Sequence, residues 1–407
     1  MNYPFFIARR YLFARRSANA INIITGISVL GITIGAAALV LVLSVFNGFE
    51  SLLAGMYGYF NPEIKITPRV GKTFQADSVL LARINAIPEV ETVSAALEEI
   101  AFFEYGPVQD FGILKGVDAR YASVVPIREA TLPDSSSFIL NDGERYGAIA
   151  GAGLRYKLGL NIGQPGAWLN VYMPAKTQGA LDRPFRSRTM RPNGLFSIQQ
   201  EVDNQYVLTD IELTRDLLEA EADEVSALEL RCVGPQAVPQ AKKRLRELLG
   251  EDYHIKDRYE QNEALFKVMR LEKWIAFGIV SLMLALLTFN MIGALWMLVL
   301  EKQRDIAILK SMGATDRGVF SLFVWEGMLL TTLGLLLGLG LAFFLYFLQT
   351  RYDLITIPDG FLVSSYPIEL RAGDFVPITA AVLSIGLLAS LLPARRTLRI
   401  TPVLQEY

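Results

Sequence analysis

The sequence predicts a membrane protein with an α-helical domain of four spans and a large α+β domain outside the cytoplasm. Of its 407 residues, 52% are hydrophobic and only 20% are charged, which is less charge than soluble domains usually carry. The uncharged residues gather in four long stretches instead of spreading along the chain. Between the first two stretches lie about 225 residues of ordinary composition, enough to fold as a domain of their own.

The four apolar stretches are long enough to cross a bilayer. The chain is free of charge over residues 21–46, 274–300 and 375–394, and residues 318–348 contain only Glu326. A hydrocarbon core about 30 Å thick requires roughly 20 helical residues at about 1.5 Å each. We therefore place the spans at residues 21–47, 273–300, 318–348 and 375–394.

The basic residues beside the spans predict how the chain is oriented. Lys and Arg are concentrated in residues 1–20, 301–317 and 395–407, whereas residues 349–374 hold two of them against four acidic residues. Short segments rich in Lys and Arg stay in the cytoplasm. Both termini and the middle segment are therefore expected in the cytoplasm, and residues 48–272 are expected outside it together with the acidic loop.

The first residues allow two interpretations. Residues 3–16 place aromatic and aliphatic side chains among four arginines. Such a segment is typical of an amphipathic helix that lies in the membrane interface before the first span. It is equally typical of a basic flank that only sets the topology.

Short periodic segments in residues 48–272 predict a mixture of strands and helices. Alternating apolar residues predict strands at 63–67, 168–173 and 225–232. Helical periodicity that ends at Pro or Gly predicts helices at 76–86, 148–158 and 238–249. Because strands and helices do not alternate regularly, the domain is expected to be α+β.

Two further segments of this domain are singled out by their composition. Residues 174–196 are rich in Pro, Gly and Arg, which predicts a long surface loop that could also grip a partner. From Tyr253 onward the chain reaches the second span without Gly or Pro. We therefore expect a helix from this point that continues out of the membrane as a stalk.

Composition and motifs exclude most catalytic chemistry. With 39 basic and 41 acidic residues, no strong field favours nucleic acid. One Cys and one His exclude an intramolecular disulfide, a multi-Cys metal site and a pair of His ligands. Gly71-Lys72-Thr73 resembles the end of a phosphate-binding loop, but Ile66 stands where the first Gly is required. We expect no catalytic, cofactor-binding or metal site on this chain, so any ATP must be hydrolysed by a partner.

Small and polar residues within the spans predict contacts between helices. Gly31 and Gly35 in the first span, and Gly334 and Gly338 in the third, lie about one turn apart and would let helices approach closely. Glu326 is expected to make an interhelical hydrogen bond or to lie near the cytoplasmic interface, and not to move ions.

Residues 301–317 predict a short amphipathic helix in the cytoplasm. Ile306, Ile308 and Leu309 give it an apolar side, charged residues cover the other side, and Gly313 is expected to end it. Such a helix, held across the ends of two spans, could fill a groove on a soluble partner. The alternative is an inert connecting loop.

Several segments resemble a known family of membrane proteins. EKQRDIAILKSMGATDR, followed by Trp325-Glu326-Gly327, resembles the signature of the FtsX-like permeases, and the closing LLPARRTLRITPVLQEY resembles the ending of that family. FIARRYLFARR and GITIGAAALVLVLSVFNGFE resemble the lipoprotein-releasing branch, the LolC/LolE family. One span, a large outer domain and three further spans are also the layout of the MacB-like (type VII) permeases.

The resemblance implies a permease subunit of an ATP-binding cassette (ABC) transporter in a bacterial inner membrane, with its large domain in the periplasm. A separate ABC ATPase subunit would bind ATP and Mg and drive the permease by mechanotransmission. The resemblance also implies a second permease copy or a paralogue, a lipoprotein cargo taken from the outer leaflet, and a periplasmic carrier protein that receives it.

The resemblance assigns roles to two groups of residues. The coupling helix that docks on the ATPase maps onto Lys302, Arg304, Asp305, Ile308, Leu309, Lys310, Gly313 and Arg317. A carrier-binding hook, which one permease of that branch possesses, would correspond to the loop at 174–196, with Pro174, Arg183, Pro184, Phe185 and Pro192 as its contact residues.

A release task also requires an apolar groove. Each buried CH₂ of an acyl chain contributes about 0.8 kcal/mol, so an extracted chain must be sheltered from water. Residues at the outer ends of the first two spans are candidates to line such a groove, with ordinary helix packing as the alternative. These residues are Val45, Phe46, Phe49, Leu52, Met56, Leu265 and Met269.

Three other functions compete with lipoprotein release. A macrolide- or peptide-exporter-type permease would work with an adaptor and an outer-membrane duct. A signal transmitter that controls a periplasmic cell-wall hydrolase would have a much smaller outer domain. An ion-coupled secondary transporter would need paired charges within the membrane or repeated halves, and the sequence contains neither.

Overall fold

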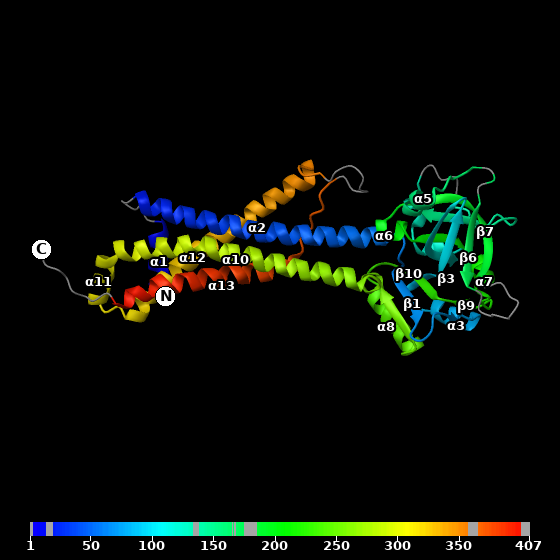
Figure 1. Ribbon diagram of the computed structural model, residues 1–407. Coiled ribbons are helices and arrows are strands. Elements are labelled where there is room, and N and C mark those ends of the chain that lie inside the picture. The colour runs from blue at the N-terminus through cyan, green and yellow to red at the C-terminus, as the bar shows by residue number, and fades with distance from the viewer. Residues whose placement is uncertain are drawn as a thin grey trace. The chain divides into compact units, whose positions relative to one another are not determined.

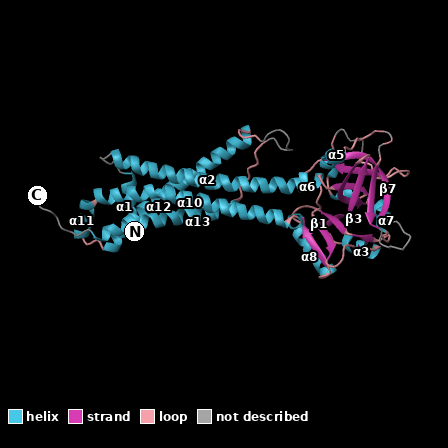
Figure 2. Ribbon diagram, viewed as in Figure 1, coloured by secondary structure: helices cyan, strands magenta, loops and turns pink. Residues whose placement is uncertain are grey.

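The chain folds into two compact units, described here by a computed structural model over residues 3–13, 19–132, 138–164, 166, 168–174, 185–356 and 365–399. The helical unit consists of Met1–Leu52 and Lys267–Tyr407, and the α+β unit of Leu53–Phe266. Figure 1 shows the course of the chain, and Figure 2 shows that the strands belong to the α+β unit.

Four long helices form the helical unit, at the places where the sequence predicts the spans. They are α2 (Asn19–Tyr57), α10 (Glu263–Glu301), α12 (Asp316–Tyr352) and α13 (Phe375–Arg396). All four are long and apolar enough to cross a membrane, and no other helix among the described residues is. The shorter helices are α1 (Tyr3–Phe13), α11 (Gln303–Ser311), and the 3-10 turns η2 (Ala372–Asp374) and η3 (Thr397–Arg399).

The helices of this unit pack around one apolar core. Its buried residues come from all four long helices and from α11, and include Leu39, Leu295 and Phe323. The first residues form a helix, α1, which packs against α12. Phe5 of α1 contacts Trp325 edge to face, with ring centroids 5.2 Å apart.

The α+β unit is built on a nine-stranded sheet, counted over the described residues. The strand order is β11-β1-β10-β3-β4-β8-β5-β7-β6. Because β6 also pairs with β3, the strands from β3 to β6 in this order form a closed ring. The strands are β1 (Ile64–Pro68), β3 (Val90–Tyr105), β4 (Val108–Val117), β5 (Gly147–Gly151), β6 (Leu169–Pro174), β7 (Phe185–Phe196), β8 (Tyr206–Asp210), β10 (Ala227–Cys232) and β11 (Tyr253–Asp257); β2 (Phe74–Gln75) and β9 (Glu224–Val225) pair separately.

Short helices cover the sheet of the α+β unit. They are α3 (Ser78–Asn85), α4 (Tyr121–Val124), η1 (Ile127–Ala130), α5 (Ala152–Leu158), α6 (Gln200–Asp203), α7 (Ile211–Leu218), α8 (Val238–Leu249) and α9 (Arg258–Gln261). Side chains from α5 and α7 join those of the ring strands in one apolar cluster, which includes Leu154, Phe103 and Val171. The helices predicted at 76–86 and 238–249 are confirmed as α3 and α8.

A buried group of charges lies beside a second apolar cluster of this unit. The Lys115 ammonium, 1% exposed, lies 2.6 Å from the fully buried Glu229 carboxylate and 3.2 Å from Glu98. It also lies over the rings of Phe60 and Tyr121, at 4.5 and 4.9 Å from their centroids. Burial alone would raise the pKa of Glu98, but neighbouring lysines lower it to about 2. The group therefore stays ionised inside the fold.

Two predictions for the α+β unit are wrong in part. The helix predicted at 148–158 starts only at Ala152, because residues 147–151 form β5 and pair with β7 and β8. A short apolar run fits a buried strand or a helix equally well, and here the pairing on both sides decides. The loop predicted at 174–196 is a strand from Phe185 onward, paired with β6 and β5. Residues 175–184 lie outside the described residues.

The predicted stalk helix also starts later than expected. Residues 253–257 form β11, which pairs with β1. Asp257 then caps the short helix α9 in a capping box with Glu260. Asn262, with φ −115° and ψ 42°, leaves the helical conformation, so the continuous helix into the second span begins at Glu263.

Candidate functional site

The short helix α11, predicted from the sequence, lies between α10 and α12 (Figure 1). Ile306 is buried in the core of the helical unit, and Leu309 packs against that core. Gly313 ends the segment with φ +96°, a conformation that favours glycine. Thr315 then caps α12 by accepting a hydrogen bond from the Gly318 amide at 3.2 Å. The inner face of α11 and its C-terminal end are therefore held in place.

The opposite face of α11 is exposed and partly apolar. Arg304, Ile308 and Met312 are four residues apart, so they lie on the same side of the helical turn. Ile308 is 49% exposed and Met312 is 78% exposed, and Arg304 is exposed beside them. Met312 is not among the predicted coupling residues, although its spacing from Ile308 is a usable signal. Two exposed apolar side chains, Ile308 and Met312, beside the cation of Arg304 form a surface suited to a protein partner.

The other coupling residues differ in what they contact. Lys302 pairs with Asp305 at 3.3 Å along the helix. Lys310 is largely buried: it pairs with Asp316 at 2.8 Å and donates to the Thr397 carbonyl at 3.1 Å. Lys310 therefore ties α11 to neighbouring segments of its own unit, a role that the sequence did not indicate. Arg317 is exposed at the start of α12.

Small residues lie where the long helices meet. A Cβ on Gly35 would collide with Leu284 of α10. A Cβ on Gly334 or Gly338 would lie 2.8 or 2.7 Å from side chains of α2. Gly31 is less crowded, because the nearest α10 side chain would be 3.7 Å away. Glu326 is fully buried within the helical unit.

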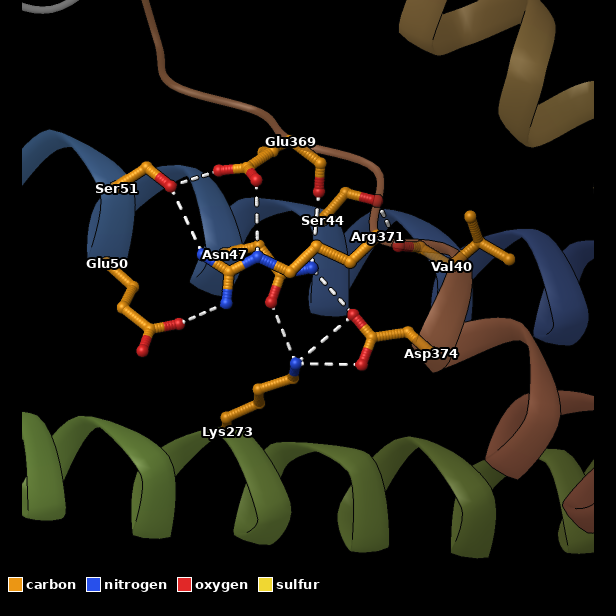
Figure 3. A network of polar contacts seen from close by, with 9 residues as sticks. All are labelled: Val40, Ser44, Asn47, Glu50, Ser51, Lys273, Glu369, Arg371 and Asp374. Carbon is orange, nitrogen blue, oxygen red and sulfur yellow. Dashed lines mark hydrogen bonds and ion pairs between the residues drawn. The ribbon is translucent and has the colours of Figure 1, made fainter. Parts of the chain in front are cut away.

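At the end of α10 opposite α11, an extended segment crosses α2 (Figure 3). We call this segment, residues 366–371, the strap. The Glu369 amide donates to the Ser44 carbonyl of α2 at 2.9 Å. Gly48 permits this approach, because a Cβ there would collide with the Pro367 carbonyl and would lie 2.7 Å from the backbone nitrogen of Ile368. The strap therefore contacts α2 through its backbone.

A cation from α10 joins the strap region to α2 and α13. The Lys273 ammonium donates to Asn47 Oδ1 at 2.7 Å and to the two carboxylate oxygens of Asp374 at 2.8 and 3.1 Å. Asn47 is fully buried, and its amide nitrogen donates to Asp374 Oδ2 at 2.6 Å. As Figure 3 shows, these three side chains come from three different helical segments and converge on one point.

Arg371 of the strap makes a second set of polar contacts, with side chains of α2 and of the strap itself. Arg371 donates to Glu50 at 2.6 Å, to the Ser51 hydroxyl at 3.1 Å and to Glu369 at 3.2 Å. Ser51 also contacts Glu369 directly. Burial would raise the pKa of Glu369, but the hydrogen bonds from Ser51 and Arg371 lower it below its usual value. We call the strap together with Asn47, Lys273 and Asp374 the clasp.

The candidate lipoprotein contacts are all half-buried. Val45, Phe46, Phe49, Leu52 and Met269 belong to the helical unit, and Met56 and Leu265 to the α+β unit. Phe49 packs edge to face on Tyr366 of the strap, with centroids 5.2 Å apart. Leu265 packs against the apolar cluster that contains Tyr57 and Phe60. For these two residues the packing alternative has direct support, and the groove stays a prediction.

The candidate carrier contacts that the structure describes lie in two paired strands. Pro174 ends β6 and pairs with Phe185, the first residue of β7, which is 56% exposed. Pro192 is buried within β7 opposite Ala148, so its predicted role in a loop is wrong. Arg183 and Pro184 lie outside the described residues. Among the residues that the structure describes, no cluster of His, Cys, Asp and Glu could hold a metal ion.

Comparison with known proteins agrees with the sequence analysis and the fold. The chain matches the family described as MacB-like periplasmic core domain over residues 25–248, and the family described as FtsX-like permease C-terminal over residues 277–402. The "Lipoprotein-releasing system transmembrane protein LolC" of Xylella fastidiosa is 25% identical over 97% of this chain and 96% of its own length. LolE of Haemophilus influenzae is 24% identical over 99% and 98%, and LolC of Neisseria meningitidis is 26% identical over 97% and 97%. The predicted resemblance and the predicted fold class, four spans with a large α+β extracytoplasmic domain, are confirmed.

Proposed function

Because the chain belongs to the family of the MacB-like periplasmic core domain, we propose that it is a permease subunit of an ABC transporter that releases lipoproteins from the membrane. One observation carries the proposal. Proteins named for lipoprotein release match the chain over 97% or more of its length, so the similarity includes both the helical unit and the α+β unit.

In this function the chain lies in a bacterial inner membrane, with both termini and α11 in the cytoplasm. The α+β unit lies in the periplasm. The concentration of Lys and Arg in residues 1–20, 301–317 and 395–407 supports this orientation.

The partner on the cytoplasmic side is a separate ABC ATPase that holds ATP and Mg. Its groove would receive Ile308 and Met312, because these apolar side chains are exposed on a helix whose other face is fixed in the core. Arg304, on the same face, would meet an acidic rim of the groove. The ATPase performs the hydrolysis, and this chain converts its closure into movement of the long helices.

On the outer side the cargo is a lipoprotein in the outer leaflet, and a periplasmic carrier protein receives it. At about 0.8 kcal/mol per CH₂, removing a single long acyl chain from the bilayer costs on the order of 10 kcal/mol. Spontaneous release is therefore negligible, and ATP energy together with a sheltered apolar path is required. A second copy of this chain or a paralogue would complete the path.

The test uses proteoliposomes that contain this chain, its second permease, the ATPase and a triacylated lipoprotein. ATP and a periplasmic carrier are added, and the lipoprotein in the soluble fraction is measured. We expect release only when ATP and carrier are both present. A matched preparation with an ATPase unable to hydrolyse ATP controls for spontaneous loss.

ATP hydrolysis without release would contradict the proposal, provided that the second permease is present in the preparation. The alternative that then gains support is an exporter-type permease. One relative is named for export, the "Pyoverdine export ATP-binding/permease protein PvdT" of Pseudomonas syringae. It is 22% identical over 93% of this chain but only 56% of its own length. Capture of an adaptor protein would distinguish that alternative from a signal transmitter.

A further inference from the structure

The clasp joins three helical segments at one end of the helical unit. None of its residues belongs to the coupling helix α11, so docking of the ATPase on α11 does not account for it. We propose that the clasp makes this end of α2, α10 and the start of α13 move as one body. Lys273 and Asp374 are then positioning residues for lipoprotein release, an inference that rests on the proposed function. Movement imposed on α10 at α11 reaches α2 and α13 through the clasp.

The first reason is that α10 is packed against its neighbours less extensively than α2 is. In its most apolar window only 17% of the residues are buried by the rest of the chain, against 44% for α2. Within lipid no hydrophobic force drives helices together, so packing and hydrogen bonds must hold them. A helix with few packed side chains needs a polar attachment if its movement is to reach its neighbours.

The second reason is that Lys273 supplies this attachment with all of its donors. Its ammonium makes hydrogen bonds to Asn47 and to both oxygens of Asp374, at 2.7 to 3.1 Å. Hydrogen bonds between ionised groups are about twice as strong as neutral ones. The side chains of Lys273 and Asp374 are only 15% and 20% exposed, so water competes weakly for these bonds.

The third reason is that the strap is joined to α2 by backbone as well as by side chains. The Glu369 amide bonds to the Ser44 carbonyl, and Gly48 lets the strap lie directly on the helix. Arg371 adds its contacts to Glu50 and Ser51. A polar network in which every member is bonded favours one rigid arrangement. The geometry therefore points to a permanent link and not to a latch that opens in each cycle.

The inference predicts that breaking the clasp separates hydrolysis from release. Lys273→Met keeps the length of the side chain but removes the charge, and Asp374→Asn removes the opposite charge. In the complete transporter each variant should retain ATPase binding and hydrolysis but lose about tenfold in lipoprotein released per ATP hydrolysed. The matched control is Lys267→Met, because Lys267 is exposed on the same helix. Unchanged release per ATP in both clasp variants would overturn the inference.

A charge swap separates positioning from simple stability. Lys273→Asp combined with Asp374→Lys keeps the ion pair but reverses it. Asn47 can serve the reversed pair by turning its amide, which exchanges donor and acceptor. We expect the double variant to recover release per ATP relative to either single reversal. Equal losses in the single and double variants would contradict a role for the pair.

A covalent link tests whether the clasp must open. Ser51 and Glu369 contact each other, so Ser51→Cys with Glu369→Cys places two thiols within reach of a short, reducible bifunctional thiol cross-linker between α2 and the strap. Burial raises the pKa of the native Cys232 to about 12, so this thiol reacts slowly. Release by the cross-linked transporter should equal or exceed release by its reduced form. Loss of release on cross-linking, restored by reduction, would overturn the rigid link in favour of a latch.

The wild-type transporter distinguishes failure of this inference from failure of the proposed function. If the wild type does not release lipoprotein with ATP and carrier, the proposed function fails first. If the wild type releases lipoprotein and the clasp variants match it, only the inference fails. Thermal unfolding of each variant shows whether it is folded, and the cross-link experiment needs no destabilising substitution at Lys273.

Discussion

Replacing Ile308 and Met312 with Ser should weaken binding of the ATPase without unfolding the chain. Both side chains lie on the exposed face of α11, whereas the face that holds the helix in the core is formed by Ile306 and Leu309. The double variant therefore removes apolar surface that the isolated chain leaves in water. The double variant should therefore weaken the complex with the ATPase and leave the stability of the fold unchanged.

The size of the effect follows from the exposed fractions. Burying a whole Ile or Met side chain contributes about 1.5–3 kcal/mol. Ile308 has 49% of its surface left to bury and Met312 has 78%, which gives together about 2–4 kcal/mol. At about 1.4 kcal/mol for each factor of ten, the dissociation constant should rise roughly 30- to 700-fold.

The assay measures binding of the purified ATPase to the full chain in nanodiscs, at equilibrium and without nucleotide. The control variant is Val70→Ser, which changes a residue that is 88% exposed in the α+β unit. Melting temperatures should be the same for the double variant, the control and the wild type. An unchanged dissociation constant in a folded double variant would refute the reasoning, because it would mean that this face of α11 is not buried in the complex.

Three further changes test other parts of the structure. Lys115→Met removes the closer cation of the buried Glu229 carboxylate and leaves only Lys65, at 3.9 Å; it should destabilise the α+β unit by about 3–5 kcal/mol in chemical denaturation. Burial would raise the pKa of Glu98, but the neighbouring lysines lower it from 4.5 to about 2. The ionised Glu98 therefore stabilises the fold fully above pH 4.5, and this contribution is lost as the pH falls towards 2. In unfolding measured over a series of pH values, Glu98→Gln should lack this dependence. Gly48→Ala forces a Cβ into the strap and should cost about 1–3 kcal/mol, whereas Gly26→Ala on the same helix meets open space and should gain up to about 1 kcal/mol; equal melting shifts would contradict the strap contact.

The parts of the fold that the sequence predicts are those decided by local pattern. The spans follow from uninterrupted apolar length, and α8 follows from its periodicity and the glycine at its end. β7 is the opposite case. Pro192 and Gly194 are typical of a loop, yet both lie in a strand because β5 pairs along it. The strand conformation is imposed by partners that are distant in sequence, and no local pattern of β7 reports them.

The same distinction applies to the candidate site. The sequence predicts α11, because its apolar spacing and its final glycine are local features. It does not separate Arg304, which is exposed, from Lys310, which is bonded to Asp316 inside the unit. The clasp is even harder to predict from the sequence, because Asn47 and Asp374 are 327 positions apart. A single polar residue near the end of a span is too common to indicate a partner so far away.

The two kinds of contact between the long helices differ in what they can resist. Along the middle of the spans, Gly35, Gly334 and Gly338 let helices approach through packing alone. Such contacts set the distance between helices but resist sliding weakly, because a small displacement exchanges one van der Waals neighbour for another. The hydrogen bonds of Lys273 have fixed partners and directions, so a displacement of α10 breaks them outright. The position of α10 along its own axis is therefore fixed at the clasp. A permease that transmits movement along this helix requires such a point of attachment, because packing contacts would let α10 slide before α2 and α13 moved.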